Sequence, residues 1–376
     1  MESNFLELAR RFMPLPTAPF NESFVADEIA TWTAERPRLH TRRDRFGNLL
    51  LTYNGTPETQ RAVQPALILT AHMDHPALGY LKRLSPRRHL FEVLGGLPRH
   101  HLHGARVRLY NPDAGPGQQA TEGRITQVQT PEKGRSRTVV TLRRSMDLPR
   151  GAFAVLDLAP WVRRGRKLHA AVCDDLAGMC CALAFIDNLQ RDAQPVHVGV
   201  LLTRAEEVGF GGMLAAVRHG FLPPQALYIN IECSSAAAGA PLGAGPVLRV
   251  GDRLTLFDPS INAGLAALAE NLVQTDSGFS YQRKLMDGGA CEATVLSQEG
   301  FTVGAVALPL ANYHNNGPRG VAPEAIHLDD ALSLVKLLVE AAVSPGGLAQ
   351  LGSQAAQSLD KHLEGRYQAL VPRLLA

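Results

Sequence analysis

Four continuous apolar runs alternate with segments of helical periodicity along this chain. The runs lie at 65–72 (PALILTAH), 195–207 (PVHVGVLLTRAEE), 225–232 (QALYINIE) and 301–309 (FTVGAVALP). Continuous apolar runs, as opposed to alternating apolar and polar positions, are typical of strands that are covered on both faces. The clearest helical patterns lie at 174–190 and 262–274. This order predicts an α/β fold in which helices flank a mixed, largely parallel sheet.

Residues 77–165 follow a different pattern. Their short β-branched segments roughly alternate apolar and polar positions and are separated by turn-rich stretches at 113–121 and 131–136. We therefore expect a small all-β domain at 77–165. It would be inserted into a discontinuous α/β domain formed by residues 1–76 and 166–376.

Composition and charge narrow the class of protein. The 376 residues carry a formal net charge of +3, and 45% are hydrophobic and 19% charged, as in ordinary globular proteins. The basic stretch at 87–108 is not interleaved with aromatic residues. We interpret it as solvated surface charge and expect no nucleic-acid partner.

The sequence also bears on the cellular compartment. In segment 1–16, Glu2 and two arginines interrupt the apolar residues, which is typical of an amphipathic helix and not of a secretory signal. No apolar run approaches the roughly 18 residues of a membrane span. Five cysteines lack the paired spacing of a zinc ribbon. We expect reduced thiols in a cytoplasmic protein without a membrane partner.

Histidine and carboxylate side chains follow several of the predicted strands. The carboxyl ends of parallel strands lie at one edge of a sheet, where loops carry ligand-binding groups. The residues at these ends are His72, Asp74, Glu206, Glu207, Glu232 and His314, and Asp174 and Asp175 stand just before a predicted helix. We expect these side chains to meet at that edge.

Each motif has an ordinary structural explanation as well. His72 and Asp74 could form a surface pair, the two aspartates an N-cap with its neighbour, and the two adjacent glutamates a solvated turn. Their joint occurrence at strand ends favours chemistry. Two histidines and three or more carboxylates suit a pair of divalent cations, such as zinc, cobalt or manganese, bridged by one carboxylate. Asp74 would then accept the second N–H of the His72 ring and orient it.

Seven stretches resemble the cytosolic dizinc aminopeptidases of the tetrahedral-aminopeptidase and glutamyl-aminopeptidase type, metallopeptidase family forty-two. They are AHMDHPALG, CDDLAGMCCAL, TRAEEVGFGGMLAA, INIE, GAGPVLRVGD, DGGACEATVLSQEGF and YHNN, in the order of that family. The resemblance implies that Asp174 bridges two metal ions and that Glu206 is the general base. The other implied ligands are the pair His72 and Glu232 and the pair Glu207 and His314. The resemblance also implies a homo-oligomer.

Three positions depart from the family pattern. Glu232 stands where the nearest relatives more often have aspartate, and Glu292 in GGACEA stands where Gly-Gly-Thr-Asp-Ala is expected. Members of the family usually have an arginine shortly before the histidine that corresponds to His314, and this arginine is absent here. We therefore expect an intact metal centre and an altered substrate pocket.

These observations predict a hydrolase with two divalent ions per chain that removes N-terminal residues from peptides with a free amino terminus. Glu206 and Asp74 would serve catalysis, and Glu292 is a candidate for binding the substrate's α-amino group. One alternative is a deacylase or carboxypeptidase of the same clan, which would hold a substrate carboxylate with a cation. Another is a non-catalytic, metal-stabilised binding protein. For the inserted β-domain we consider oligomerisation and control of substrate entry.

Overall fold

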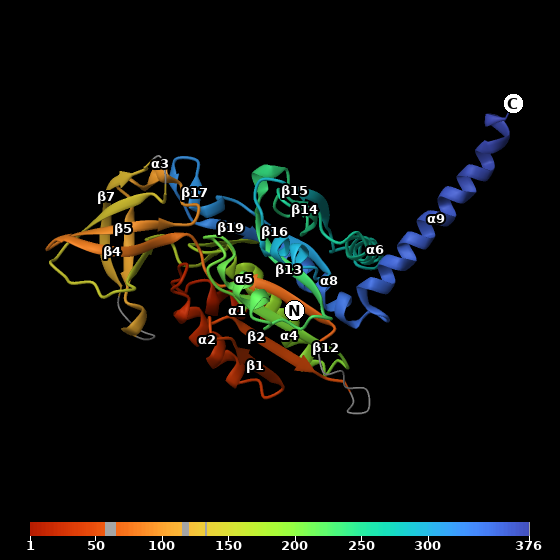
Figure 1. The fold of residues 1–376 in the computed structure, drawn as a ribbon, viewed down its shortest axis with the longest axis horizontal. Coiled ribbons are helices and arrows are strands. Elements are labelled where there is room, and N and C mark those ends of the chain that lie inside the picture. Colours follow the sequence, from red (N-terminus) through yellow and green to blue (C-terminus); the bar gives the residue numbers. More distant parts are fainter. Residues whose placement is uncertain (57–64, 115–119, 132–133, 376) are drawn as a thin grey trace.

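An eight-stranded mixed sheet forms the centre of the larger of the two parts of the molecule, and a β-barrel forms the smaller part (Figure 1). The computed structural model describes residues 1–56, 65–114, 120–131 and 134–375. In spatial order, the strands are β1 (Leu39–Arg43), β2 (Leu49–Asn54), β12 (His197–Thr203), β3 (Leu67–His72), β13 (Leu227–Ser235), β16 (Val303–Leu310), β14 (Val247–Asp252) and β15 (Gln282–Met286). Strands β12, β3, β13 and β16 run parallel, whereas β2 and β14 are antiparallel to their neighbours β12 and β16. The predicted α/β fold with a mixed sheet is confirmed.

Helices cover both faces of this sheet. They are α1 (Glu2–Phe12), α2 (Ser23–Ala34), α4 (Leu176–Arg191), α5 (Gly211–Arg218), α6 (Pro259–Thr275), α7 (Glu292–Gln298) and α8 (Leu328–Val343). Only the first turns of α9 (Gly347–Leu374) pack against this core. Successive residues of a strand point to opposite faces. Accordingly, Leu69 of β3 packs in the core with α1, α4, α6 and α8, whereas Ile68 packs in the core with α5 and α7. Both faces of β3 are buried, as its continuous apolar run predicted.

A closed antiparallel barrel lies beside the sheet (Figure 1). Its strands, in order around the barrel, are β4 (Ala77–Ser85), β5 (Arg88–Leu94), β8 (Arg137–Leu142), β7 (Thr121–Gln129), β6 (Arg106–Tyr110) and β9 (Phe153–Leu156), and the short α3 (Arg99–Leu102) follows β5. The turn-rich stretches at 113–121 and 131–136 lie partly outside the described residues.

A second small sheet lies between the barrel and the body. β10 (Val162–Arg164), inside the predicted insertion, pairs with β11 (Lys167–Ala170), and β11 pairs with β19 (Glu324–His327). Two further short strands, β17 (Asn316–Gly317) and β18 (Gly320–Val321), form a hairpin in the loop before β19. The division into domains at 77 and 165 stays a prediction.

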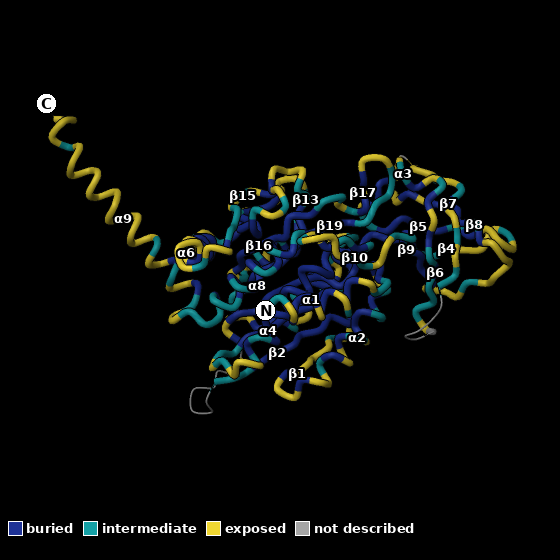
Figure 2. The backbone as a smooth tube through the Cα atoms, turned by 180° about the vertical axis from the view of Figure 1, so that it is seen from behind, coloured by how far each residue is buried: buried dark blue, intermediate teal, exposed yellow. Residues whose placement is uncertain are grey.

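The carboxyl-terminal helix α9 leaves the body of the molecule (Figures 1 and 2). Its first turns pack on α6, where Gly264 and Gly352 allow close approach: a Cβ on either would fall within about 2.4 Å of a backbone oxygen of the other helix. Beyond Gly352 the helix is largely exposed. Within the described ranges, no single helix is long and apolar enough to cross a membrane, and α8 and α9 pass that test only as a pair bent by 90°.

Candidate metal centre

Two groups of metal-type donors meet at the carboxyl end of the sheet and share Asp174. In the first group, His72 Nε2 lies 3.5 Å from Asp174 Oδ1 and 3.5 Å from Glu232 Oε1. In the second group, His314 Nε2 lies 3.2 Å from Glu207 Oε1 and 3.5 Å from Asp174 Oδ2. Each carboxylate oxygen of Asp174 thus faces one imidazole, as expected of a bridging ligand. We call these five residues the donor cluster.

The register of the parallel strands explains why the first group forms. Thr70 of β3 pairs with Asn230 of β13, so His72 and Glu232, each two residues further on, lie level on neighbouring strands. Glu232 lies inside β13, which continues to Ser235, and not at the end of the strand as expected. Because side chains two residues apart share a face, this register alone places the imidazole beside the carboxylate.

Asp74 orients more of the cluster than the sequence suggested. Its backbone carbonyl lies 3.1 Å from His72 Nδ1, whereas its carboxylate lies 3.6 Å from that nitrogen. The carboxylate accepts the backbone N–H groups of Glu206 at 2.9 Å and Glu207 at 3.1 Å. Asp74, in the loop after β3, therefore holds the loop after β12 in place through these two hydrogen bonds.

The aspartate pair does not act as an ordinary helix cap. Asp175 occupies the N-cap position of α4, but its side chain makes no capping hydrogen bond. Asp174 precedes it and turns its carboxylate toward the two imidazoles. The capping explanation that the sequence left open therefore does not account for the carboxylate of either residue.

Negative charge dominates the donor cluster. Burial disfavours a charged His72 ring, but hydrogen bonds with Asp174 and other carboxylates outweigh burial and raise its pKa well above the usual range. Burial also disfavours a charged His314 ring. The carboxylates of Glu207 and Asp174 outweigh burial and raise the pKa of His314 well above the usual range. Burial and neighbouring carboxylates raise the pKa of Glu206. The cluster therefore attracts positive charge, either as protons or as metal ions.

The donor set fits two divalent ions. In each group, one ligand atom per residue lies within 4.8 Å of the others. Asp174 Oδ1 and Glu207 Oε1 are buried, and apart from the imidazole that faces each of them, neither atom has a hydrogen-bond partner among the described residues. Buried carboxylate oxygens without partners are expected where a cation binds. Imidazole nitrogens and carboxylate oxygens are ligands that suit zinc and also bind cobalt or manganese.

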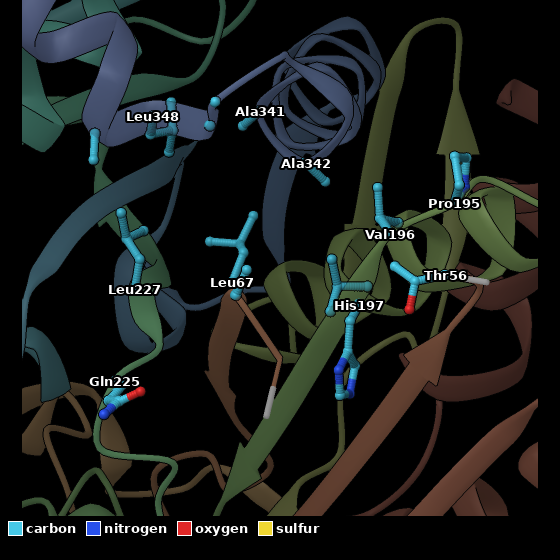
Figure 3. Close-up of a pocket in the computed structure, with 15 residues that line it drawn as sticks. Thr56, Leu67, Pro195, Val196, His197, Gln225, Leu227, Ala341, Ala342 and Leu348 are labelled. Carbon is cyan, nitrogen blue, oxygen red and sulfur yellow. The ribbon is translucent and has the colours of Figure 1, made fainter. Parts of the chain in front are cut away.

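A cavity of about 180 Å³ opens over the cluster, and we call it the cluster cavity. Its lining residues are Asp174, Glu206, Glu207, Gly209, Phe210, Glu232, Ala290 and Tyr313. A larger cavity of about 470 Å³ lies at the opposite, amino-terminal ends of the strands (Figure 3). Its lining includes Leu67, His197 and Leu227, the first residues of β3, β12 and β13. The larger cavity is therefore remote from the donors.

The sequence model of the M42 glutamyl aminopeptidase family matches residues 142–337, more than half of the chain. The chain belongs to this family. It is accordingly a peptide hydrolase. No curated protein sequence matches the chain.

Solved structures of two archaeal peptidases share the fold. The TET1 peptidase of Pyrococcus horikoshii, which assembles into a tetrahedron or a large octahedral shell, is 20% identical with a TM-score of 0.73, covering 91% of this chain and 100% of its own. The aminopeptidase APDkam598 of Desulfurococcus kamchatkensis is 19% identical with a TM-score of 0.74, covering 94% and 98%. At these identities the likeness concerns the fold.

Glu324 is a buried carboxylate of this M42 member that sequence reasoning missed. One oxygen accepts the backbone N–H groups of Cys173 at 2.8 Å and Asp174 at 3.0 Å. The other accepts the backbone N–H of His314 at 2.8 Å. The side chain therefore links the loops that carry ligands of both groups. Nothing in the local pattern at the start of β19 distinguishes this glutamate from a surface residue.

His75 and Asn315 also hold these loops together. The ring of His75 contacts the backbone carbonyl of Asp174 through Nδ1, and its Nε2 lies 3.2 Å from Asn315 Oδ1. Asn315 donates through Nδ2 to the carbonyl of Ala171 at 2.8 Å. Both residues stand next to motifs in the sequence, but only the fold brings them into contact.

The barrel side of the molecule also contacts the cluster. His314 has a left-handed backbone conformation with φ of 54°, and its Nδ1 lies 3.3 Å from the carbonyl of Gly96, which follows β5. A Cβ on Gly96 would lie 2.3 Å from that nitrogen, so this close approach requires glycine. The barrel region thus orients one histidine of the cluster through its backbone.

Glu292 is buried and is not among the residues that line the cluster cavity. It is the first residue of α7, is only 1% exposed, and both of its oxygens are buried without a hydrogen-bond partner in the described structure. Burial raises the pKa of the Glu292 carboxyl to about 8. Its role in binding the substrate's α-amino group stays a prediction.

Proposed function

We propose that this M42 member is an aminopeptidase that uses two divalent metal ions to remove N-terminal residues from peptides. The observation that carries the proposal is the pair of donor groups that share Asp174, with a further carboxylate, Glu206, on the wall of the same cavity. His72 and Glu232 would hold one ion, and Glu207 and His314 the other, with Asp174 between them.

The chain's own residues then have distinct roles. Bound divalent ions lower the pKa of water and polarise a carbonyl oxygen. Glu206 accepts the proton of the attacking water and returns it to the leaving amine, a role favoured by its raised pKa and its place on the wall of the cluster cavity. Asp74 positions Glu206 through the backbone N–H that it accepts.

The substrate amino terminus fits the same charge pattern. The cluster cavity is lined by four carboxylates and, within the described residues, by no lysine or arginine. An α-ammonium group would be attracted to such a wall, whereas a free carboxylate would be repelled from it. Glu292 is left out of this proposal because it is not among the residues that line the cavity.

Zinc is the proposed metal, with cobalt or manganese as alternatives, because imidazole and carboxylate donors suit all three. A cytoplasmic location is proposed because the five cysteines are all free and buried. A homo-oligomer is proposed because the outer part of α9 exposes a row of large apolar side chains. They are Leu359, Leu363, Tyr367, Leu370 and Leu374.

A deacylase or carboxypeptidase acting at the same cluster is the second candidate. One observation favours it: the buried Arg249 lies in an adjoining cavity and could hold a substrate carboxylate. The carboxylate-rich wall of the cluster cavity speaks for the aminopeptidase.

Substrate assays on the metal-loaded protein separate these candidates. We expect turnover of aminoacyl-anilides, no turnover of N-acetyl amino acids, loss of activity with a chelator, and recovery with zinc. Turnover of N-acetyl amino acids alone would favour the deacylase, and no turnover of either class would favour a binding protein.

A single substitution tests the catalytic role of Glu206. Glu206→Gln keeps the size of the side chain and removes proton acceptance, so we expect kcat to fall at least about 100-fold with near-normal metal content. The matched variant Glu207→Ala should lower metal content and activity together. Loss of metal in Glu206→Gln, with activity restored by excess metal, would mean that the two glutamates have the opposite roles.

A further inference from the structure

Tyr313 is a hydrogen-bond donor on the wall of the cluster cavity that the proposed mechanism leaves without a role. Among the described residues that line this cavity, only Tyr313 has a side-chain hydroxyl or N–H group. The rest of the wall consists of four carboxylates and the residues Gly209, Phe210 and Ala290. A tyrosine hydroxyl keeps its proton at neutral pH because its ordinary pKa is about 10. The cavity therefore has one neutral donor side chain in a wall that is otherwise negative or apolar.

The hydroxyl of Tyr313 lies at the donor cluster. The phenol ring stacks on the imidazole of His314, with the ring centroids 3.8 Å apart and the planes 22° apart. The phenol interacts electrostatically with the same four carboxylates that line the cavity, namely Asp174, Glu206, Glu207 and Glu232. No residue in the described part of the chain accepts a hydrogen bond from this hydroxyl. Because Tyr313 is 38% exposed, a substrate in the cavity can contact it.

The loop that carries Tyr313 is fixed on both sides of this residue. Three of its neighbours share a left-handed backbone conformation, with φ of 55°, 54° and 61°, and these are Asn312, His314 and Asn315. Such conformations are strained for residues other than glycine and persist only where surrounding contacts hold them. These three residues donate, in the same order, to the carbonyl of Pro323, the carboxylate of Glu324 and the carbonyl of Ala171, each at 2.8 Å. The unpaired hydroxyl of Tyr313 is thus held on a rigid support.

The proposed reaction produces an anion in this cavity. When water attacks a peptide carbonyl, the water oxygen bonds to the carbonyl carbon, and the π electrons of the C=O bond move to the carbonyl oxygen. That oxygen becomes negatively charged in a cavity whose wall holds four carboxylates. Like charges repel each other strongly away from bulk water, so a donor that is already aimed at the oxyanion stabilises the transition state. Tyr313 has the chemistry and the fixed position that this task requires.

We propose that Tyr313 is a catalytic residue whose hydroxyl donates a hydrogen bond to the oxyanion of the tetrahedral intermediate. The phenol keeps its proton throughout the reaction. When the intermediate collapses, the C=O bond forms again, the C–N bond breaks, and the leaving amine takes the proton that Glu206 holds. This inference rests on the proposed aminopeptidase activity and adds a residue to it.

The first experiment compares wild type with Tyr313→Phe in the zinc-loaded enzyme. The substitution removes the hydroxyl and keeps the ring that stacks on His314. We expect kcat for an aminoacyl-anilide to fall about 100-fold, with KM changed less than about twofold and zinc content unchanged. Tyr80→Phe is the control, because Tyr80 packs on Phe91 in the barrel and does not line the cluster cavity. It should keep the wild-type kcat.

The second experiment measures binding without turnover. A phosphinic pseudo-dipeptide has a tetrahedral, anionic group in place of the scissile bond and therefore resembles the intermediate. Its affinity, measured by calorimetry, should fall in Tyr313→Phe by about the same factor as kcat/KM. The matching amino alcohol lacks the anionic group, so it should bind wild type and Tyr313→Phe equally. A purely structural role of the hydroxyl would weaken the binding of both ligands.

Several outcomes would overturn the role of Tyr313 while leaving the aminopeptidase activity in place. An unchanged kcat in Tyr313→Phe is one, and an equal loss of affinity for the phosphinate and the amino alcohol is another. Lower zinc content with activity restored by excess zinc is a third, because the residue would then only support His314. If wild type hydrolyses no anilide, the proposed function itself is refuted, and this inference is refuted with it.

Discussion

Replacing Glu292 with glutamine tests the electrostatics beneath the donor cluster. Glu292 is 1% exposed, its oxygens have no hydrogen-bond partner among the described residues, and burial raises its pKa from 4.5 to about 8. A carboxyl whose pKa is raised on folding stabilises the protein fully below the unfolded value and loses that contribution as pH rises to the folded value. The affected window is therefore about pH 4.5 to 8.

The size of the effect follows from that pKa difference. Each pH unit between the two values corresponds to about 1.36 kcal/mol. With a folded pKa near 8 and an unfolded pKa of 4.5, ionisation of Glu292 destabilises the fold by about 1 kcal/mol at pH 5 and by about 4 kcal/mol at pH 8. Glutamine has the same shape and does not titrate. The free energy of unfolding of Glu292→Gln relative to wild type should therefore rise by about 3 kcal/mol between these two pH values.

Urea unfolding of the metal-free protein, followed by circular dichroism at pH 5, 6.5 and 8, measures this difference. Glu299→Gln is the control, because Glu299 is an exposed glutamate just after the same helix. Its difference from wild type should not depend on pH. A difference for Glu292→Gln that stays constant within about 0.5 kcal/mol across the range would refute the reasoning, as would one that falls as pH rises.

The other predictions concern metal binding and assembly. Asp174→Ala removes the bridge of both donor groups, so metal analysis should find both sites weakened, and full occupancy by two ions would contradict the bridging role. Glu324→Gln weakens the side chain that accepts three backbone N–H groups, so zinc affinity should fall about 10- to 100-fold. If Glu324 positions the ligand loops, excess zinc should restore activity. Replacement of both Leu363 and Leu370 by serine removes apolar surface from the exposed part of α9 and should lower the mass measured by light scattering. An unchanged mass would contradict a role of α9 in assembly.

The sequence by itself determined the layered fold and the residues that could form the cluster. The continuous apolar runs of β3, β12, β13 and β16 reflect strands covered on both faces, a property that each strand carries in its own composition. Parallel strands bring their carboxyl ends to one edge, so ligand-type residues after different strands could be expected to meet before any contact was known.

Only the tertiary structure decided how those residues contact one another. Glu324 holds Cys173 and Asp174 from 150 residues away, and the Asp74 carboxylate holds the glutamate pair from more than 130 residues away. Hydrogen bonds of this kind leave no periodic pattern in the sequence, because the donors are backbone N–H groups that every residue except proline has.

The same limit applies to Glu292 and Arg249. The sequence marked Glu292 as a departure from a family motif, but only the structure shows that the residue is buried and does not line the cluster cavity. Arg249 lies within a motif that resembles the family, yet its lack of a charged partner depends on what Asp252 and Glu232 already bind. Composition along the chain fixes which groups are available, whereas the packing of distant segments decides which of them remain unpaired and free to bind a substrate.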